Sequence, residues 1–284
     1  MLYQEPLFRP PAEGNSNIVQ VTYGCPYNRC RFCPMYKTKT YYEKTESELK
    51  AHLTELTRLT DTRVARVFLA DGDTMFMQTE KLVNYMKIVK QYLPHTRRIG
   101  TYGSVFSLKN KNAEELKQLY ENGLRFVYFG IESGDEETLR QMDKRCSRAE
   151  MIATCRKVLA AGLTLSVTLI LGLGGKQRWQ EHIKESSSLV NQISPTYTNL
   201  LSLILKHSSL ENDPEYNSFT SAQYMEEMKR FIELIECQTV FFSNHASNFL
   251  PLKARLPREK SKILEIIEQC KDNDSILDLI NQPL

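Results

Sequence analysis

Short apolar blocks alternate with amphipathic segments along the chain, and this pattern predicts β-strands separated by helices. The apolar blocks are rich in β-branched and aromatic residues, and we expect strands over 17–23, 64–70, 98–102, 124–131, 163–171 and 196–205. The segments between them place apolar residues three and four positions apart, which predicts helices over 46–60, 78–93, 111–122, 135–161 (broken near 144–147) and 178–192. Six strands alternating with helices favour an α/β fold with a parallel sheet.

The two ends of the chain depart from this alternation. Residues 1–16 contain three prolines and a glycine, which predicts an irregular arm. After residue 205 we expect a polar loop, a helix over 221–236, a strand over 239–242, a charged helix from Pro257 and a short helix over about 274–282. We therefore expect an N-terminal arm (1–16), a core (17–205) and an extension (206–284) that covers the core.

Composition narrows the class of protein only slightly. The chain has 284 residues, of which 41% are hydrophobic and 25% charged, as in ordinary soluble domains. No apolar run is long enough to span a membrane, and the N-terminus lacks a secretory signal, so a cytoplasmic location is expected. The net charge of +3 is too balanced to indicate nucleic-acid binding by itself.

Three cysteines gather directly after the first predicted strand, and they carry the strongest chemical signal. Cys25, Cys30 and Cys33 have the spacing C-x4-C-x2-C. Thiolates are the usual ligands of iron–sulfur clusters, and three of them leave one iron of a four-iron cluster open. A structural zinc site is the main alternative, but it would need a further ligand, and the five histidines lie far away in sequence, at positions 52, 95, 182, 207 and 245.

This motif resembles the signature of the radical S-adenosylmethionine (SAM) superfamily, C-x3-C-x2-C with an aromatic residue before the last cysteine. Phe32 occupies the aromatic position, and the departure is one extra residue between Cys25 and Cys30. The resemblance implies a partial (β/α)6 TIM-like barrel with a small α/β C-terminal extension. It also implies a 4Fe-4S cluster at the three cysteines and SAM as cofactors. Such enzymes cleave SAM reductively to a 5′-deoxyadenosyl radical, which abstracts hydrogen from a substrate.

The resemblance also assigns roles to residues after the second and third strands. Gly72 and Asp73 are similar to the family's Gly-Gly-Glu turn, which receives the methionine amino group of SAM. Ser104 follows the third strand and is expected to reach the methionine or the ribose. An ordinary Asp-Gly turn and a capping serine are the alternatives.

Two further strand ends complete the implied cofactor site. Residues 130–134 look like the family's Gly-x-Gln/Glu-Ser-Gly segment, in which Glu132 would accept ribose hydroxyls and Ser133 would bond the SAM carboxylate. Lys144 or Arg145 lies where relatives carry a cation for that carboxylate, with a surface cation as the alternative. At the fifth strand, Ile170 would pack on adenine, and Gly172 would let the backbone pass close to the adenine. Thr168 replaces the glycine that begins the family's motif at this strand.

The reaction itself is not specified by the sequence. We expect a compact, single-cluster enzyme that takes electrons from flavodoxin or ferredoxin and acts on a small molecule rather than on a nucleic acid or at a membrane. One alternative is an RNA-modifying enzyme acting on tRNA, with basic residues near 144–148 and 253–260 as its footprint. Another is a non-catalytic iron–sulfur protein. The polar segment 243–248 is expected to lie over the site and contribute to substrate binding.

Overall fold

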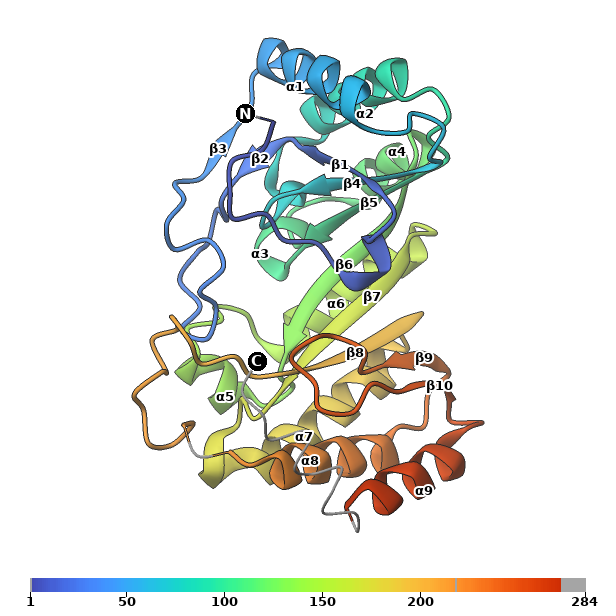
Figure 1. Cartoon of the computed structure of the whole chain (residues 1–284). Coiled ribbons are helices and arrows are strands. Elements are labelled where there is room, and N and C mark those ends of the chain that lie inside the picture. The colour runs from blue at the N-terminus through green and yellow to red at the C-terminus, as the bar shows by residue number, and fades with distance from the viewer. Residues whose placement is uncertain (1, 218, 272–284) are drawn as a thin grey trace. The chain divides into compact units, whose positions relative to one another are not determined.

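The computed structural model describes residues 2–217 and 219–271 (Figure 1). Within these residues the main sheet has eight strands in the order β1-β4-β5-β6-β7-β8-β9-β10. The pairs β1·β4, β4·β5, β5·β6, β7·β8 and β8·β9 are parallel, and β10 runs antiparallel to β9. The expected α/β class is confirmed, with strands at β1 Asn17–Gln20, β4 Arg66–Ala70, β5 Arg98–Gly103, β6 Leu124–Glu132, β7 Thr164–Leu171, β8 Tyr197–Ser202, β9 Thr239–Phe242 and β10 Lys253–Leu256.

The first predicted strand is shorter than expected. It leaves the main sheet after Gln20, because Val21 donates its N–H to Ala70 but its carbonyl accepts from Lys44. The chain then forms β2 (Thr22–Tyr23), which pairs with β3 (Tyr42–Glu43) in a separate two-stranded sheet. β3 was not predicted, because two residues are too few to give a period.

The helices follow the predicted pattern, with differences at their ends. The break near 144–147 is confirmed, because α5 and α6 are separate helices. The helix expected from Pro257 begins at Lys260, and the one expected over 274–282 lies outside the described residues. The helices are α1 Glu46–Leu59, α2 Thr79–Tyr92, α3 Val105–Leu108, α4 Ala113–Glu121, α5 Glu136–Gln141, α6 Arg148–Ala160, α7 Gly175–Ile193, α8 Ser221–Leu234 and α9 Lys260–Lys271, with short 3-10 turns η1 Pro11–Glu13 and η2 Thr74–Phe76.

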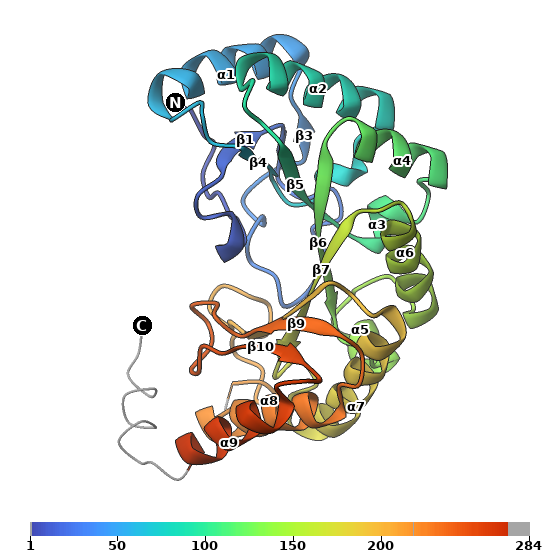
Figure 2. The same cartoon turned by 90° about the vertical axis from the view of Figure 1, so that its right-hand side faces the viewer.

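Two compact units make up the chain. The first comprises Met1–Asn28, Met35–Phe129 and Ala153–Leu165, and in it α1 and α2 lie side by side near β1 (Figure 1). The second comprises Arg29–Pro34, Gly130–Ile152 and Ser166–Leu284, and in it α7, α8 and α9 pack in sequence order (Figure 2). The domain boundaries expected from the sequence stay a prediction.

The C-terminal extension adds strands to the main sheet. β9 pairs in parallel with β8, with Tyr197 opposite Val240 and Asn199 opposite Phe242. β8, the last strand of the expected core, is therefore not the edge of the sheet, because β9 lies beside it. β10 was not predicted, because its alternation of exposed Lys253 and Arg255 with two small or apolar buried residues is short and strongly charged. Among the described residues, no helix combines the length and the apolar character needed to cross a bilayer.

Candidate active site

A buried aspartate in the first unit bonds the residues that flank the cysteine loop. Asp71 follows β4, and its Oδ2 accepts from the Gly24 N–H at 2.9 Å and from Lys39 Nζ at 2.9 Å. The side chains of Asp71 and Lys39 are 0% and 1% exposed. Because Gly24 precedes Cys25 and Lys39 follows the loop, one carboxylate holds the two ends of the cysteine segment at the end of β4.

Gly72 packs directly against the first cysteine. A Cβ at this position would lie 2.7 Å from the Cβ of Cys25, closer than real Cβ contacts allow, and the Gly72 N–H donates to Gly24 O at 3.0 Å. Glycine is thus required here for the backbone to approach Cys25. Its predicted contact with the SAM amino group stays a prediction.

Two other predicted residues of the first unit meet in the structure. The Ser104 hydroxyl, after β5, donates to Asp73 Oδ2 at 2.5 Å, and Asp73 is buried. The two strand ends thereby form one polar group, as expected for residues placed at the carboxyl ends of neighbouring parallel strands. A carboxylate held in this way is suited to accept hydrogen bonds from an amino group.

In the second unit, the aromatic residue of the motif lies in an apolar cluster that includes two of the cysteines. Phe32 is 8% exposed, and Cys30, Cys33 and Ile170 pack against the cluster to which it belongs. The other members come from the ends of α5 and β7 and from the segment after β8, and they are Met142, Leu173, Leu203, Leu205, Leu210 and Tyr216. Ile170, the predicted adenine contact, and Cys30 and Cys33, two predicted ligands of the iron–sulfur cluster, are therefore partly buried against the same apolar residues.

A buried ion pair lies near Cys30. Lys144 Nζ lies 2.9 Å from Glu132 Oε1, and both side chains are almost fully buried. Burial opposes the charge on Lys144, but Glu132 and then Cys30 outweigh it and raise the Lys144 pKa. Gly130 leaves room for the pair, since a Cβ there would lie 1.9 Å from Glu132 Oε1. Arg145, the other predicted cation, pairs with Asp143 at 3.2 Å and is exposed.

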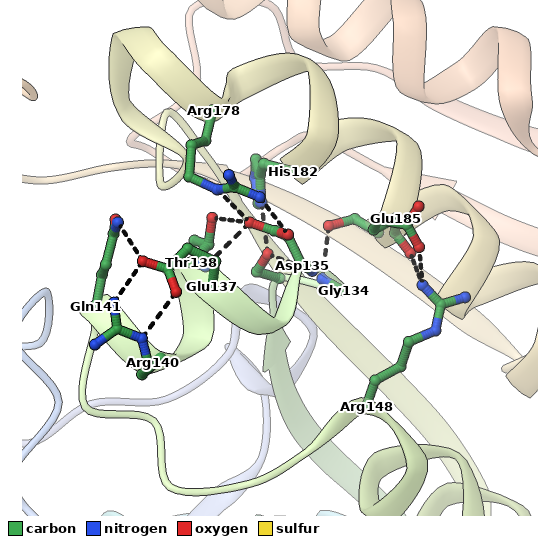
Figure 3. A network of polar contacts seen from close by, with 12 residues as sticks. Gly134, Asp135, Glu137, Thr138, Arg140, Gln141, Arg148, Arg178, His182 and Glu185 are labelled. Carbon is green, nitrogen blue, oxygen red and sulfur yellow. Dashed lines mark hydrogen bonds and ion pairs between the residues drawn. The ribbon is translucent and has the colours of Figure 1, made fainter.

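The turn after β6 is clamped by one face of α7 (Figure 3). Arg178 bonds both Asp135 oxygens at 2.9 Å, and the Gly134 N–H donates to the Ser186 hydroxyl at 2.8 Å. The backbones nearly touch, because a Cβ on Gly134 would lie 2.2 Å from Glu185 O. The final glycine of the 130–134 segment thus serves packing against α7.

Two ionisable groups near the predicted cofactor contacts were not singled out from the sequence. His182 on α7 contacts Ser133, and Glu227 on α8 accepts from the Gly172 N–H at 2.5 Å. Gly172 has φ +80°, and a Cβ on it would lie 2.7 Å from Tyr224. Burial raises the pKa of Glu227 to about 8, although the Gly172 N–H opposes this shift. The sequence did contain a signal for both residues, because His182 and Glu227 lie on the buried faces of their amphipathic helices. An ionisable side chain at such a position is unfavourable unless a hydrogen-bond partner compensates its burial.

The sequence model of the radical SAM superfamily matches residues 19–186, which is more than half of the chain. The chain belongs to the radical SAM superfamily. It is therefore a radical SAM enzyme, and members of this family use a 4Fe-4S cluster and SAM, with electrons from an external reductant. A search of curated protein sequences found no match.

Several solved structures share the fold, among them one described as a radical SAM enzyme. Methylornithine synthase (PylB) is 15% identical with a TM-score of 0.57, over 93% of this chain and 85% of that one. Coproporphyrinogen III oxidase (HemN) from Escherichia coli is 13% identical with a TM-score of 0.55, over 77% and 52%. HydG, a maturase of the [FeFe]-hydrogenase, is 14% identical with a TM-score of 0.52, over 78% and 50%. The chain thus spans about half the length of the last two, and identities this low show the fold alone.

The residues around the radical SAM motif fit the family's cofactors. Iron–sulfur clusters are bound by soft thiolate ligands, which the three cysteines can supply. Gly72 has no side chain, and this lets Cys25 pack against the backbone after β4. Within the described residues, no three side chains of His, Cys, Asp or Glu stand close enough together to hold a metal ion. The three-cysteine ligand set is therefore a prediction from spacing.

Proposed function

We propose that this enzyme holds its cluster through Cys25, Cys30 and Cys33 and uses the bound cofactors to generate a 5′-deoxyadenosyl radical that abstracts hydrogen from a small molecule. The buried Glu132–Lys144 pair carries the proposal. Cys30 contributes to the raised pKa of Lys144, and the pair offers a carboxylate and an ammonium near the end of β6. Both charges match groups of SAM, namely the ribose hydroxyls and the carboxylate.

The other predicted contacts supply complementary chemistry. Ile170 is a partly buried apolar side chain that packs against the same apolar cluster as Cys30 and Cys33, which suits a stacked base. Asp73, held by Ser104, offers carboxylate oxygens to an amino group. Phe32 is buried in an apolar cluster against which the half-buried Cys30 and Cys33 pack. Apolar surroundings suit radical chemistry, because water and stray hydrogen donors waste the radical.

A small-molecule substrate is favoured over RNA by the contacts of the basic residues. Arg145 pairs with Asp143, and Arg148 pairs with Glu185. Near the C-terminus, Arg258 pairs with Glu259, and Lys260 donates to a backbone carbonyl of α8. Basic side chains that already form ion pairs or hydrogen bonds within the protein are less available to bind the phosphates of RNA. We propose flavodoxin or ferredoxin as the reductant.

Anaerobic purification followed by cluster reconstitution tests the proposed function. Wild-type protein should contain iron and sulfide and, once reduced, should release 5′-deoxyadenosine from SAM, as detected by mass spectrometry. Replacing Cys25, Cys30 or Cys33 with Ala should abolish the cluster's visible absorbance, whereas the control Cys237→Ala should keep it. Near-stoichiometric zinc without iron in the wild-type protein would overturn the assignment.

A further inference from the structure

We propose that His182 is a positioning residue for SAM binding, because it locks the ends of β6 and β7 to each other through α7. The proposal rests on the proposed function, since Ser133 and Ile170, the two residues that it bonds, belong to the predicted cofactor site. His182 is 1% exposed. Its Nδ1 lies 2.7 Å from the Ser133 hydroxyl, and its Nε2 lies 3.0 Å from the Ile170 carbonyl oxygen.

The two partners fix the tautomer of His182. A carbonyl oxygen can only accept, so Nε2 carries the hydrogen that bonds Ile170. Burial lowers the pKa of His182 to about 4, which leaves the ring neutral near neutral pH and makes Nδ1 an acceptor. The Ser133 hydroxyl is then the donor to Nδ1, and its oxygen accepts from the Asp135 N–H at 3.0 Å.

This assignment changes what Ser133 can offer. Its single hydroxyl hydrogen is directed at His182, so the contact to the SAM carboxylate predicted for Ser133 would need that hydrogen to be redirected. Glu132 directly precedes Ser133. Because Ser133 is fixed by its bonds to His182 and to the Asp135 N–H, the backbone that carries Glu132 is held as well. We therefore assign to Ser133 and His182 the task of orienting the chain on which Glu132 lies.

Other residues of α7 hold the same turn but do not replace His182. Arg178 bonds Asp135, and Ser186 bonds Gly134, so both of these contacts end on the segment after β6 (Figure 3). His182 adds a bond to the backbone of Ile170 on β7. Ile170 packs against the same apolar residues as Cys30 and Cys33. Through its two bonds, His182 therefore fixes the position of the proposed adenine contact, Ile170, relative to the turn that follows the proposed ribose contact, Glu132.

Two near-isosteric substitutions separate the two bonds. His182→Asn keeps an acceptor near the place of Nδ1 but is too short to reach Ile170. His182→Gln can place a donor near Nε2 but loses the acceptor for Ser133. His182→Phe loses both. Leu189→Ala is the matched control, because Leu189 is fully buried on the same helix and touches neither of these bonds.

The measurement is SAM affinity by calorimetry on reconstituted protein, with iron content and thermal unfolding recorded for each variant. We expect the Asn and Gln variants to bind SAM about threefold to tenfold more weakly than wild type, and the Phe variant more weakly still, at unchanged iron content. Wild-type affinity in the Asn and Gln variants would overturn the inference, and so would an equal loss in Leu189→Ala. Failure of the wild-type protein to bind SAM would instead refute the proposed function.

Discussion

Glu132 has a backbone conformation that residues other than glycine rarely adopt. Its φ of 59° lies in the left-handed region, which costs a residue other than glycine about 1–3 kcal/mol. The surroundings impose it, because the carboxylate bonds Lys144 in the space that Gly130 leaves. Strained residues of this kind concentrate at functional sites, where the orientation of the side chain matters more than the local cost.

The first prediction tests this residue. Glu132→Gln should weaken SAM binding by about tenfold, because a neutral amide accepts hydrogen bonds less strongly than a carboxylate and leaves Lys144 uncompensated. Iron content should not change. Glu137→Gln is the control, since Glu137 is an acid of α5 that pairs with exposed Arg140. Equal affinities for wild type and Glu132→Gln by calorimetry would count against a cofactor role.

Glu227 provides a second test at this scale, through the pH dependence of stability. Its carboxyl has an ordinary pKa of 4.5, which burial raises to about 8 in the folded protein. Between these values the folded chain keeps a proton that the unfolded chain has lost. The free energy of unfolding should therefore fall as pH rises, by at most about 1.4 kcal/mol per pH unit.

Glu227→Gln removes this titration. Between about pH 5 and pH 8, the free energy of unfolding of Glu227→Gln should consequently change less than that of the wild type. At about pH 8 the variant should be more stable than the wild type. Urea unfolding of both proteins at several pH values measures the two slopes. Parallel slopes would mean that Glu227 titrates normally.

Among the elements, the cysteine loop depends on the end of β4. The Asp71–Lys39 pair is buried, and removing one partner of such a pair costs about 3–5 kcal/mol because the other charge is left uncompensated. Lys39→Met should therefore lower both stability and iron per chain after reconstitution. The exposed pair of Asp61 and Arg63 is the control, and Asp61→Asn should change neither. Full iron loading of Lys39→Met would show that the loop is positioned by other contacts.

The segment 243–248 is fastened to the carboxyl end of β8. Asn248 Nδ2 donates to Leu200 O at 2.6 Å, and the Ser247 hydroxyl accepts from the Ser202 N–H at 3.1 Å. His245 Nδ1 accepts from the Ser247 N–H, so its hydrogen resides on Nε2 when the ring is neutral. Several polar side chains of the segment thus serve its own fold, and its predicted role over the site stays a prediction.

Alanine substitution across 243–248 tests that role. If the segment contributes to the substrate site, substrate turnover should fall while 5′-deoxyadenosine still forms without coupling to product, because SAM cleavage does not need the substrate contacts. Comparing the ratio of product to 5′-deoxyadenosine in the variant and the wild type is the measurement. A wild-type ratio at wild-type rate would make the segment a surface turn.

Long apolar strands and amphipathic helices were predictable because their periods extend over many residues. The 124–131 strand is an example, and so is the α5–α6 break, where a basic run interrupts the pattern. The partners of His182 and Glu227 were not predictable from local pattern, since His182 bonds the Ser133 hydroxyl 49 residues away and Glu227 bonds the Gly172 N–H 55 residues away. The spacing of the cysteines predicted a cluster site, whereas the Asp71–Lys39 pair that holds their loop depends on tertiary structure.

At the scale of the whole molecule, most of the proposed cofactor contacts belong to the second compact unit. The second unit contains Cys30 and Cys33 together with every proposed contact from Glu132 to Gly172. It also contains β8, β9 and β10, so the C-terminal extension belongs to the same unit as most of the proposed site. Removing the extension would consequently take away neighbours of β8 and of Gly172, among them Glu227.

The last strand of the sheet has a consequence for how this protein behaves at high concentration. β10 is the final strand in the order, so in the described part of the chain the outer side of its backbone has no strand to pair with. Exposed strands of this kind can recruit one from another molecule and start aggregation. Here Lys253 and Arg255 have exposed side chains, the Arg255 N–H already donates to the Glu259 carboxylate at 2.6 Å, and Pro257 follows the strand directly. Like charges brought together by such pairing would repel each other, so the charge pattern that made β10 hard to predict also opposes pairing between two copies of this strand.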